Sequence, residues 1–148
     1  MLFRSRKTRY ATRALVLLSR IPGEGTRSIS ELAADSGAPE KYLEAILHQL
    51  RGAGLVASTR GRSGGYRLAK DASSVSLAEV VEILDPEVVR PFDGSRSAAI
   101  SSERAEFAAS LDSAAWGKAF DEWLAAIEAQ SIKHVADQAF GSAFSYSI

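Results

Sequence analysis

A short basic segment rich in glycine, residues 60–65, restricts the possible folds of this chain more than any other feature. Its sequence, Arg-Gly-Arg-Ser-Gly-Gly, separates two segments of β character, residues 55–59 and 66–69. Glycine-rich connections of this length between two such segments are typical of a β-hairpin. Because the surrounding sequence has a helical pattern, we predict one small hairpin in a mainly helical protein.

Three helices are predicted before the hairpin. A capping box formed by Ser28 and Glu31 begins the second of them, and Gly37 ends it. Pro39 suits the first turn of the third helix. Apolar residues recur at helical spacing in the first helix and in the third: Tyr10, Ala14, Leu17, Leu18 and Ile21, then Leu43, Ile46, Leu47 and Leu50.

A fourth helix is predicted after the hairpin. A second capping box, Ser76 with Glu79, begins it, and it ends before Pro86. Its buried residues are expected to be Leu77, Val80, Val81 and Leu84. Helix, helix, turn, helix and hairpin follow one another in the order of a winged helix-turn-helix. The predicted fold class is therefore mainly α with a small β-hairpin wing, followed by a long C-terminal helix.

Charge is distributed very unevenly along the chain. Residues 1–70 hold 13 Lys and Arg against 5 Asp and Glu, a formal net charge of +8, whereas residues 71–148 hold 5 against 13, a net charge of −8. Such asymmetry is typical of a protein in which one part binds a polyanion. The basic half is the predicted winged helix, which favours double-stranded DNA as the partner.

The candidate DNA-contacting residues lie on three predicted elements. The exposed face of the third helix can enter a major groove, the arginines of the hairpin tip can reach phosphates or a narrow minor groove, and arginines of the first helix can add phosphate contacts. A solvated charged face, or a winged helix that contacts only proteins, remains an alternative. The candidates are Arg6, Arg9, Ser28, Lys41, Tyr42, Glu44, His48, Arg60 and Arg62.

A composition break, residues 86–102, separates this region from one further long helix. That helix places aromatic and apolar residues along one stripe, which suits pairing of two chains. The tryptophans could instead be core residues of one chain, or line a small-molecule pocket, for which no polar group is evident. The candidate dimer contacts are Trp116, Phe120, Trp123 and Ile127. The tail, residues 139–148, has no assigned role.

Several classes of function are unsupported by the sequence. With no cysteine there is no disulfide, thiolate nucleophile or cysteine-ligated metal, and His48 and His134 are too far apart in sequence to suggest a metal site. No catalytic or nucleotide-binding motif is present, so we expect neither an enzyme nor a bound cofactor. The longest early apolar run, residues 14–18, is too short to span a membrane, and a soluble cytoplasmic protein is expected.

Four motifs of the first half stand out: Ile-Ser-Glu-Leu-Ala at 29–33, Tyr-Leu-Glu-Ala-Ile-Leu at 42–47, Leu-Arg-Gly-Ala-Gly-Leu-Val-Ala-Ser at 50–58 and, most specific, Gly-Arg-Ser-Gly-Gly-Tyr-Arg-Leu at 61–68. With these motifs the chain resembles the Rrf-two family of bacterial winged helix-turn-helix regulators, which includes relatives of IscR, NsrR and CymR. The resemblance implies a dimer, paired through the C-terminal helix, that binds a near-palindromic operator. It also implies that Lys41, Tyr42 and Glu44 lie on the recognition helix and Arg60 on the wing.

The chain departs from this family where many members bind a [2Fe–2S] cluster. Three cysteines hold that cluster, in a stretch corresponding here to residues 92–111, which contains neither Cys nor His. We therefore divide the chain into a DNA-binding region (1–85), a loop in place of the cluster-binding loop (86–104), and a dimerisation helix with a tail (105–148). The expected function is a homodimeric, cluster-free transcriptional repressor, controlled by an unidentified small molecule or regulatory protein. A winged-helix protein-interaction module, controlled by a partner protein, is the alternative.

Overall fold

The computed structural model describes residues 5–89 and 102–145. Its first part contains α1 (Arg6–Leu18), α2 (Ile29–Ser36), α3 (Glu40–Gly52), β1 (Val56–Thr59), β2 (Gly65–Leu68) and the 3-10 helix η1 (Ala72–Ser74). Its second part contains α4 (Leu77–Leu84), α5 (Pro86–Val89), α6 (Ser102–Glu128) and α7 (Ile132–Ser145). Helices with one antiparallel hairpin confirm the predicted fold class, and the hairpin strands lie within a residue of their predicted positions.

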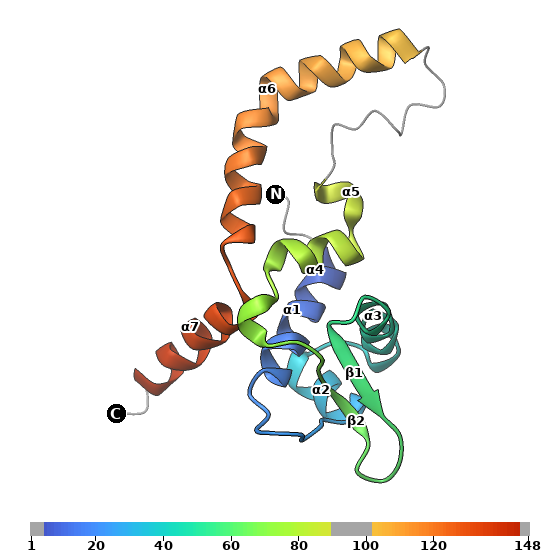
Figure 1. The fold of residues 1–148 in the computed structure, drawn as a ribbon, viewed down its shortest axis with the longest axis vertical. Coiled ribbons are helices and arrows are strands. Elements are labelled where there is room, and N and C mark those ends of the chain that lie inside the picture. The colour runs from blue at the N-terminus through green and yellow to red at the C-terminus, as the bar shows by residue number, and fades with distance from the viewer. Residues whose placement is uncertain (1–4, 90–101, 146–148) are drawn as a thin grey trace.

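Helix α1 lies at the centre of the body of the molecule (Figure 1). Of its predicted apolar face, Ala14 and Leu18 are buried, whereas Tyr10, Leu17 and Ile21 are only partly buried against the core. Ala11 and Leu15, which the predicted face did not include, are at 0% exposure. Helices α2, α3, α4 and α7 and strand β2 all contact it. The predicted stripe of α3, from Leu43 to Leu50, packs into the same core. The helical periodicity of the sequence therefore identified the buried stripe of α3 correctly and that of α1 in part.

Helix α2 begins with the capping box that the sequence predicts. The Ser28 hydroxyl accepts from the Glu31 amide, and the Glu31 carboxylate accepts from the Ser28 amide at 2.9 Å. The Ser28 hydroxyl also donates to the Glu31 carboxylate at 3.0 Å. The bond from the Ser28 amide first, and then the bond from its hydroxyl, hold the pKa of Glu31 below its ordinary value. Gly37 ends the helix in the left-handed conformation at φ 71°.

The second predicted capping box is only half formed. Ser76 accepts from the Glu79 amide at 3.1 Å, but the Glu79 carboxylate bonds to Lys70 Nζ at 2.9 Å. The lysine comes from the end of the hairpin, so a tertiary ion pair replaces the local hydrogen bond. Sequence spacing within one helix cannot show such a competitor.

The loop predicted over residues 86–104 is helical at both of its ends. Pro86 begins the single turn of α5, where its fixed φ suits a first helical position, and α6 already begins at Ser102. The sequence from Glu103 onward is rich in strong helix formers, which explains the early start. Residues 90–101, which form most of the predicted loop, lie outside the described residues.

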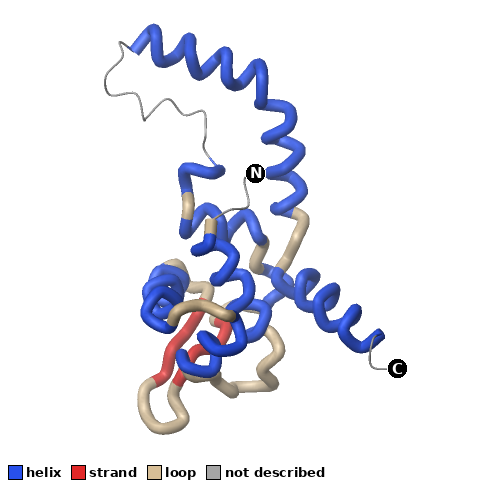
Figure 2. The backbone as a smooth tube through the Cα atoms, turned by 180° about the vertical axis from the view of Figure 1, so that it is seen from behind, coloured by secondary structure: helices blue, strands red, loops and turns tan. Residues whose placement is uncertain are grey.

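Two backbone hydrogen bonds join the connection between α6 and α7 to the segment at the start of α4. The Leu77 amide donates to the Gln130 carbonyl and the Ile132 amide donates to the Val75 carbonyl, both at 2.8 Å. Figures 1 and 2 show that α6, which precedes this connection, extends away from the body and is bent. Helix α7, which follows it, lies beside α1. No helix in the described ranges is both long and apolar enough to cross a bilayer.

Helix α7 covers much of the tail to which the sequence assigned no role. Ile132 and Ala136 are buried, and Phe140 packs on the core beneath the Arg20 guanidinium, 4.6 Å from the ring centroid. Two signals could have revealed it. Ser131 accepts from the His134 amide as an N-cap, and Ile132, Val135, Ala136 and Phe140 recur at helical spacing.

Replacing Ile132 with Ala should therefore destabilise the whole protein. Ile132 is fully buried, so losing its side chain should lower the free energy of unfolding by about 2–5 kcal/mol. Lys133→Ala, which removes only a surface ion pair with Asp137, is the control and should cost less than about 1 kcal/mol. Urea denaturation measures both. Equal effects would show that α7 is not part of the cooperative core.

Candidate nucleic-acid interface

The outer face of α3 presents a contiguous set of polar side chains. Burial of Leu43, Ile46, Leu47 and Leu50 turns the opposite side of the helix outward. Lys41, Glu44 and His48 are exposed there, as the sequence predicts, and with Ala45 and Gln49 they line one shallow depression. The set combines a cation, a carboxylate, an imidazole and an amide, which supply both donors and acceptors for base edges.

Aromatic and ionic contacts fix α3 relative to α1 and α2. The rings of Tyr42 and Tyr10 meet edge to face with centroids 5.9 Å apart, and the Arg13 guanidinium lies 5.7 Å from the Tyr10 centroid. Arg13 also donates to the Ser36 carbonyl at 2.9 Å, at the end of α2. Tyr42, predicted to contact DNA, is 40% exposed, so one side of its ring packs and the other faces solvent.

A second set of contacts ties α3 to the hairpin. Arg51, in the last turn of α3, donates to the Ser58 hydroxyl of β1 at 2.9 Å. Its other terminal nitrogen lies 3.2 Å from His48 Nδ1. One arginine therefore links the hairpin to a residue of the exposed face, an arrangement that the sequence does not reveal.

The hairpin is pinned to the residue that precedes the cap of α2. Arg27 and Tyr66 exchange two backbone hydrogen bonds, at 2.9 and 2.8 Å, which form an isolated antiparallel bridge beside the β1–β2 pair. Gly65 makes this close approach possible, because a Cβ atom there would lie 2.4 Å from the Arg27 carbonyl oxygen. The Arg27 side chain also forms an ion pair with Asp35 of α2.

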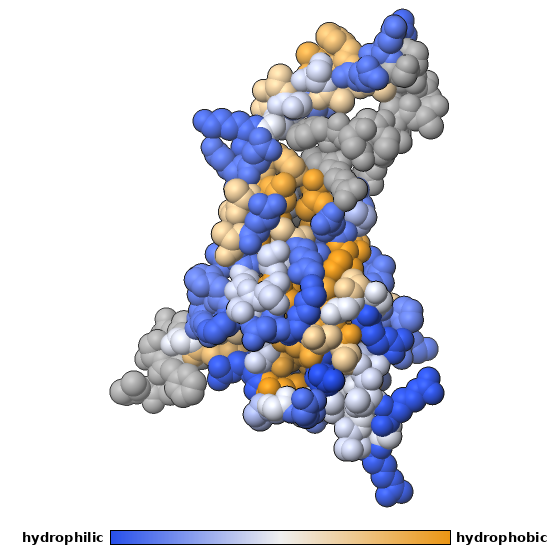
Figure 3. All heavy atoms as spheres, in the orientation of Figure 1, coloured by the Kyte–Doolittle hydropathy of each residue, from blue (hydrophilic) through white to orange (hydrophobic). Residues whose placement is uncertain are grey.

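The two arginines of the hairpin tip, Arg60 and Arg62, are exposed. Gly61 between them has φ +110°, a conformation that favours glycine. Figure 3 shows long hydrophilic side chains projecting from the end of the molecule that the tip occupies in Figure 1. The Thr26 hydroxyl donates to the Ser63 carbonyl of this tip at 3.0 Å, and the two exposed guanidinium groups can follow a phosphate backbone.

The remaining predicted contacts lie on α1 and at the start of α2. Arg6 and Arg9 are exposed on α1, on the same side as Arg13. The Ser28 hydroxyl is occupied by the capping box, which leaves the N-terminal end of α2 as the group that could meet an anion there. The structure therefore places the predicted DNA contacts on α1, α2, α3 and the hairpin, all within the basic half.

The residues of the apolar stripe predicted for dimerisation become more exposed from Ile127 towards Trp116. Ile127 is 4% exposed and packs with Ala78 and Val81 of α4, Trp123 and Phe120 are half-buried, and Trp116 is 65% exposed. Ile127 is thus already covered within its own chain, and the exposed end of the stripe lies toward Trp116. Figure 3 shows apolar surface gathered along α6.

The sequence analysis missed a second apolar face on α6. Phe107 and Leu111 are 65% and 55% exposed. At 100° per residue they lie on the side of the helix away from Trp116. The available signal was the spacing of Phe107 and Leu111, apolar side chains at i and i+4 in the predicted dimerisation helix, but the predicted stripe began only at Trp116.

The two histidines are far from each other in the fold as well. His48 lies on α3 and His134 on α7, and both are exposed. Across residues 5–89 and 102–145, no three metal-binding side chains of the His, Cys, Asp or Glu type come together.

Comparison with known proteins gives one consistent result. Residues 4–138 match the Rrf2 (Rrf-two) family, described as an iron-dependent transcriptional regulator. A curated rrf2-like HTH-type transcriptional regulator of Rhodobacter capsulatus is 45% identical over 84 residues, which are 55% of this chain and 56% of the relative. The match therefore spans little more than half the length of that relative.

Two solved structures resemble nearly the whole fold. CymR, the global cysteine regulator of B. subtilis, has a TM-score of 0.72 at 25% identity over 93% of this chain and 98% of CymR. IscR of T. potens has a TM-score of 0.69 at 27% identity over 91% of this chain and 86% of IscR.

Gly65→Ala should loosen the hairpin from α2. The added Cβ must displace the Arg27 backbone, so we expect a loss of about 1–3 kcal/mol in the free energy of unfolding and faster hydrogen exchange at the Arg27 and Tyr66 amides. Gly52→Ala, at the end of α3 where a Cβ meets nothing within 4 Å, is the control and should be neutral or slightly stabilising. Unchanged exchange at both amides in Gly65→Ala would contradict the pinned hairpin.

Proposed function

The chain belongs to the Rrf2 family of transcriptional regulators, and from this premise we propose that it is a homodimeric repressor that binds a near-palindromic operator. The observation that carries the proposal is the exposed polar face of α3, held beside a hairpin whose tip presents Arg60 and Arg62. A helix with one buried and one polar face fits a major groove about 12 Å wide.

The exposed side chains divide into two kinds of contact. Lys41, Glu44 and His48 can read base edges, since lysine donates to guanine and a carboxylate accepts from cytosine. Arg6 and Arg9 of α1 meet phosphates, which carry affinity without sequence information. The tip arginines enter an adjacent groove or follow its phosphates. The acidic half then lies away from the DNA, which explains how a chain of zero net charge binds a polyanion.

Two copies pair through the exposed part of α6. Trp116 on one face and Phe107 and Leu111 on the other leave large apolar side chains uncovered in a single chain, which a second helix can bury. A two-fold dimer presents its two α3 helices to half-sites about 34–36 Å apart. This spacing requires an operator whose halves are related by the same symmetry.

The donor set of this chain does not fit an iron–sulfur cluster. The full sequence contains no cysteine, and its two histidines lie on α3 and α7. Clusters are held by thiolates, at most partly replaced by imidazoles or other ligands. We therefore propose that this member of an iron-dependent family is controlled without a cluster.

Arg60→Ala should weaken binding to the operator by about 1–3 kcal/mol if Arg60 reads a base or a narrow groove. Arg9→Ala should weaken binding to all sequences alike and reduce the salt slope by about one unit, because it removes one phosphate contact. Lys118→Ala on α6, outside the basic half, is the matched control and should leave binding unchanged. Fluorescence anisotropy at several salt concentrations with specific and random duplexes measures all three.

A gel-retardation assay with a fragment carrying the protein's own promoter separates DNA binding from a purely protein-binding winged helix. Retardation at moderate salt that survives an excess of random DNA supports the regulator. No retardation, or full affinity in both arginine variants, would contradict the assigned interface.

Trp116→Glu should dissociate the dimer, because it places a charge in an apolar contact. Ala126→Glu adds the same charge at an exposed position between the two apolar faces of α6 and is the control. Sedimentation equilibrium gives the mass of each variant. A Trp116→Glu protein that stays dimeric with full operator affinity would show that the chains pair elsewhere.

DNA binding should be indifferent to iron. Protein purified without oxygen should show no visible absorption, and operator affinity should be the same with and without a chelator, because no thiolate is available. A brown protein with stoichiometric iron, or an affinity that falls on chelation, contradicts the cluster-free proposal.

A further inference from the structure

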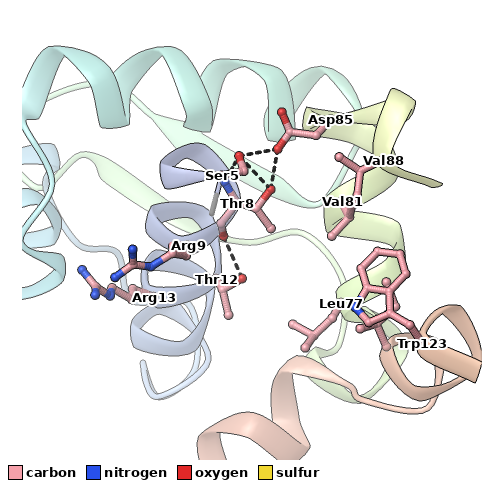
Figure 4. A pocket seen from close by; sticks show the side chains of 11 residues that line it. Ser5, Thr8, Arg9, Thr12, Arg13, Leu77, Val81, Asp85, Val88 and Trp123 are labelled. Carbon is pink, nitrogen blue, oxygen red and sulfur yellow. Dashed lines mark hydrogen bonds between the residues drawn. The ribbon is translucent and has the colours of Figure 1, made fainter. Parts of the chain in front are cut away.

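A cavity of about 300 Å³ lies where the DNA-binding half meets α6. This volume is at the lower end of the range for small-molecule sites. One wall is formed by α1, and the facing wall by α4, α5 and α6 (Figure 4). The site adjoins one of the two tryptophans of the sequence, Trp123, and it supplies the polar groups that the sequence alone does not reveal.

The wall opposite α1 is apolar apart from the Asp85 carboxylate, which lies between α4 and α5, and the indole N–H of Trp123. It is formed by Leu77 and Val81 of α4, Val88 of α5, and Trp123 and Ile127 of α6. These side chains surround a space wide enough for an aromatic ring or a short alkyl chain. The apolar part of a ligand is therefore expected on this side.

The α1 wall carries hydroxyl groups whose hydrogens are already used. Ser5 and Thr8 donate to the same oxygen of Asp85, Oδ2, at 2.5 and 2.6 Å, and Thr12 donates to the Thr8 carbonyl at 2.9 Å. What remains free on these groups is lone pairs, since an ionised carboxylate only accepts. A ligand that hydrogen-bonds to this wall must therefore be a donor.

Three charged residues line the cavity, one acid and two arginines. Asp85 lines the cavity, whereas the guanidinium groups of Arg9 and Arg13 point away from Trp123 (Figure 4). Arg13 is also bound to the Ser36 carbonyl, and Lys7 donates to the Leu84 carbonyl at 2.9 Å. A positive donor beside Asp85 would gain a charge-assisted hydrogen bond, and the indole ring across the cavity would favour a cation.

We propose that this cavity binds a small amine with an apolar body, the ammonium group lying on the Asp85, Thr8 and Thr12 side and the body against Trp123. A carboxylate ligand would bring a second negative charge to Asp85 and would offer no hydrogen to the free lone pairs. A neutral hydrocarbon would leave those lone pairs without water or a donor. Among these ligand classes, an amine is the one that satisfies both walls.

Three probes of similar shape test the ligand class by isothermal titration calorimetry. Phenethylamine should bind once per chain with a dissociation constant below about 1 mM. 2-Phenylethanol, which donates without a charge, should bind more weakly, and 3-phenylpropionate at least about tenfold more weakly. Equal binding of the anion, or no saturable phenethylamine binding, would overturn the proposal.

Two near-isosteric variants test the polar wall. Asp85→Asn removes the charge and keeps one acceptor oxygen, so phenethylamine affinity should fall about tenfold while 2-phenylethanol affinity changes less. Thr12→Val, which removes a hydroxyl acceptor, should lower the affinity for both phenethylamine and 2-phenylethanol. Asp121→Asn, an exposed carboxylate on α6, is the control for loss of charge. Circular dichroism and urea denaturation confirm that each variant is folded. Unchanged phenethylamine affinity in Asp85→Asn and Thr12→Val would place the amine elsewhere.

The regulatory part of this inference rests on the proposed function. If the cavity is an effector site, phenethylamine at a concentration that nearly saturates the original protein but leaves most of Asp85→Asn unbound should change operator affinity in the original protein and much less in the variant. Amine binding without any DNA binding would contradict the proposed function but leave the site standing. DNA binding that ignores the bound amine would overturn the effector role.

Discussion

Burial of one face of α1 determines where the other elements of the described fold can lie. Ala11 and Ala14 are small and fully buried, which allows neighbouring backbones to approach closely, and Leu15 fills the space between them. Helices α2, α3, α4 and α7 and strand β2 all pack on this one helix. Its opposite face keeps the arginines in solvent. One amphipathic helix thus separates the hydrophobic core from the cationic surface.

Local patterns in the sequence predicted those parts of the fold that local interactions determine. The periodicity of α1, α3 and α4, the capping box at Ser28 and the glycines of the hairpin each act within a few residues. The errors arose where a distant partner decides. Lys70 competes for Glu79, and the core beside α1 receives α7 through a bridge between Val75 and Ile132. Neither partner can be identified from spacing within one element.

The same distinction holds for the candidate DNA-binding site. Helical spacing alone put Lys41, Glu44 and His48 on one exposed face, because the buried stripe of α3 leaves no other place for them. The contacts that aim this face join residues far apart in sequence. Tyr10 meets Tyr42, Arg51 meets Ser58, and Arg27 meets Tyr66. Sequence therefore indicates which side chains can read DNA, whereas the fold decides how rigidly they are presented.

Helix α1 also joins the cavity to the DNA-binding surface. Thr8 and Thr12 line the cavity, while Tyr10 and Arg13, within one turn of them, hold Tyr42 of α3 and the Ser36 carbonyl of α2. Because a helix of this length moves as a rigid unit, a ligand that shifts α1 relative to α6 must also change the support of α3. The change in DNA affinity is limited by the difference between the ligand's binding free energies for the two arrangements of α1. The hydrogen bonds of Ser5 and Thr8 to Asp85 join α1 to the residue between α4 and α5, so any such preference acts first on this contact.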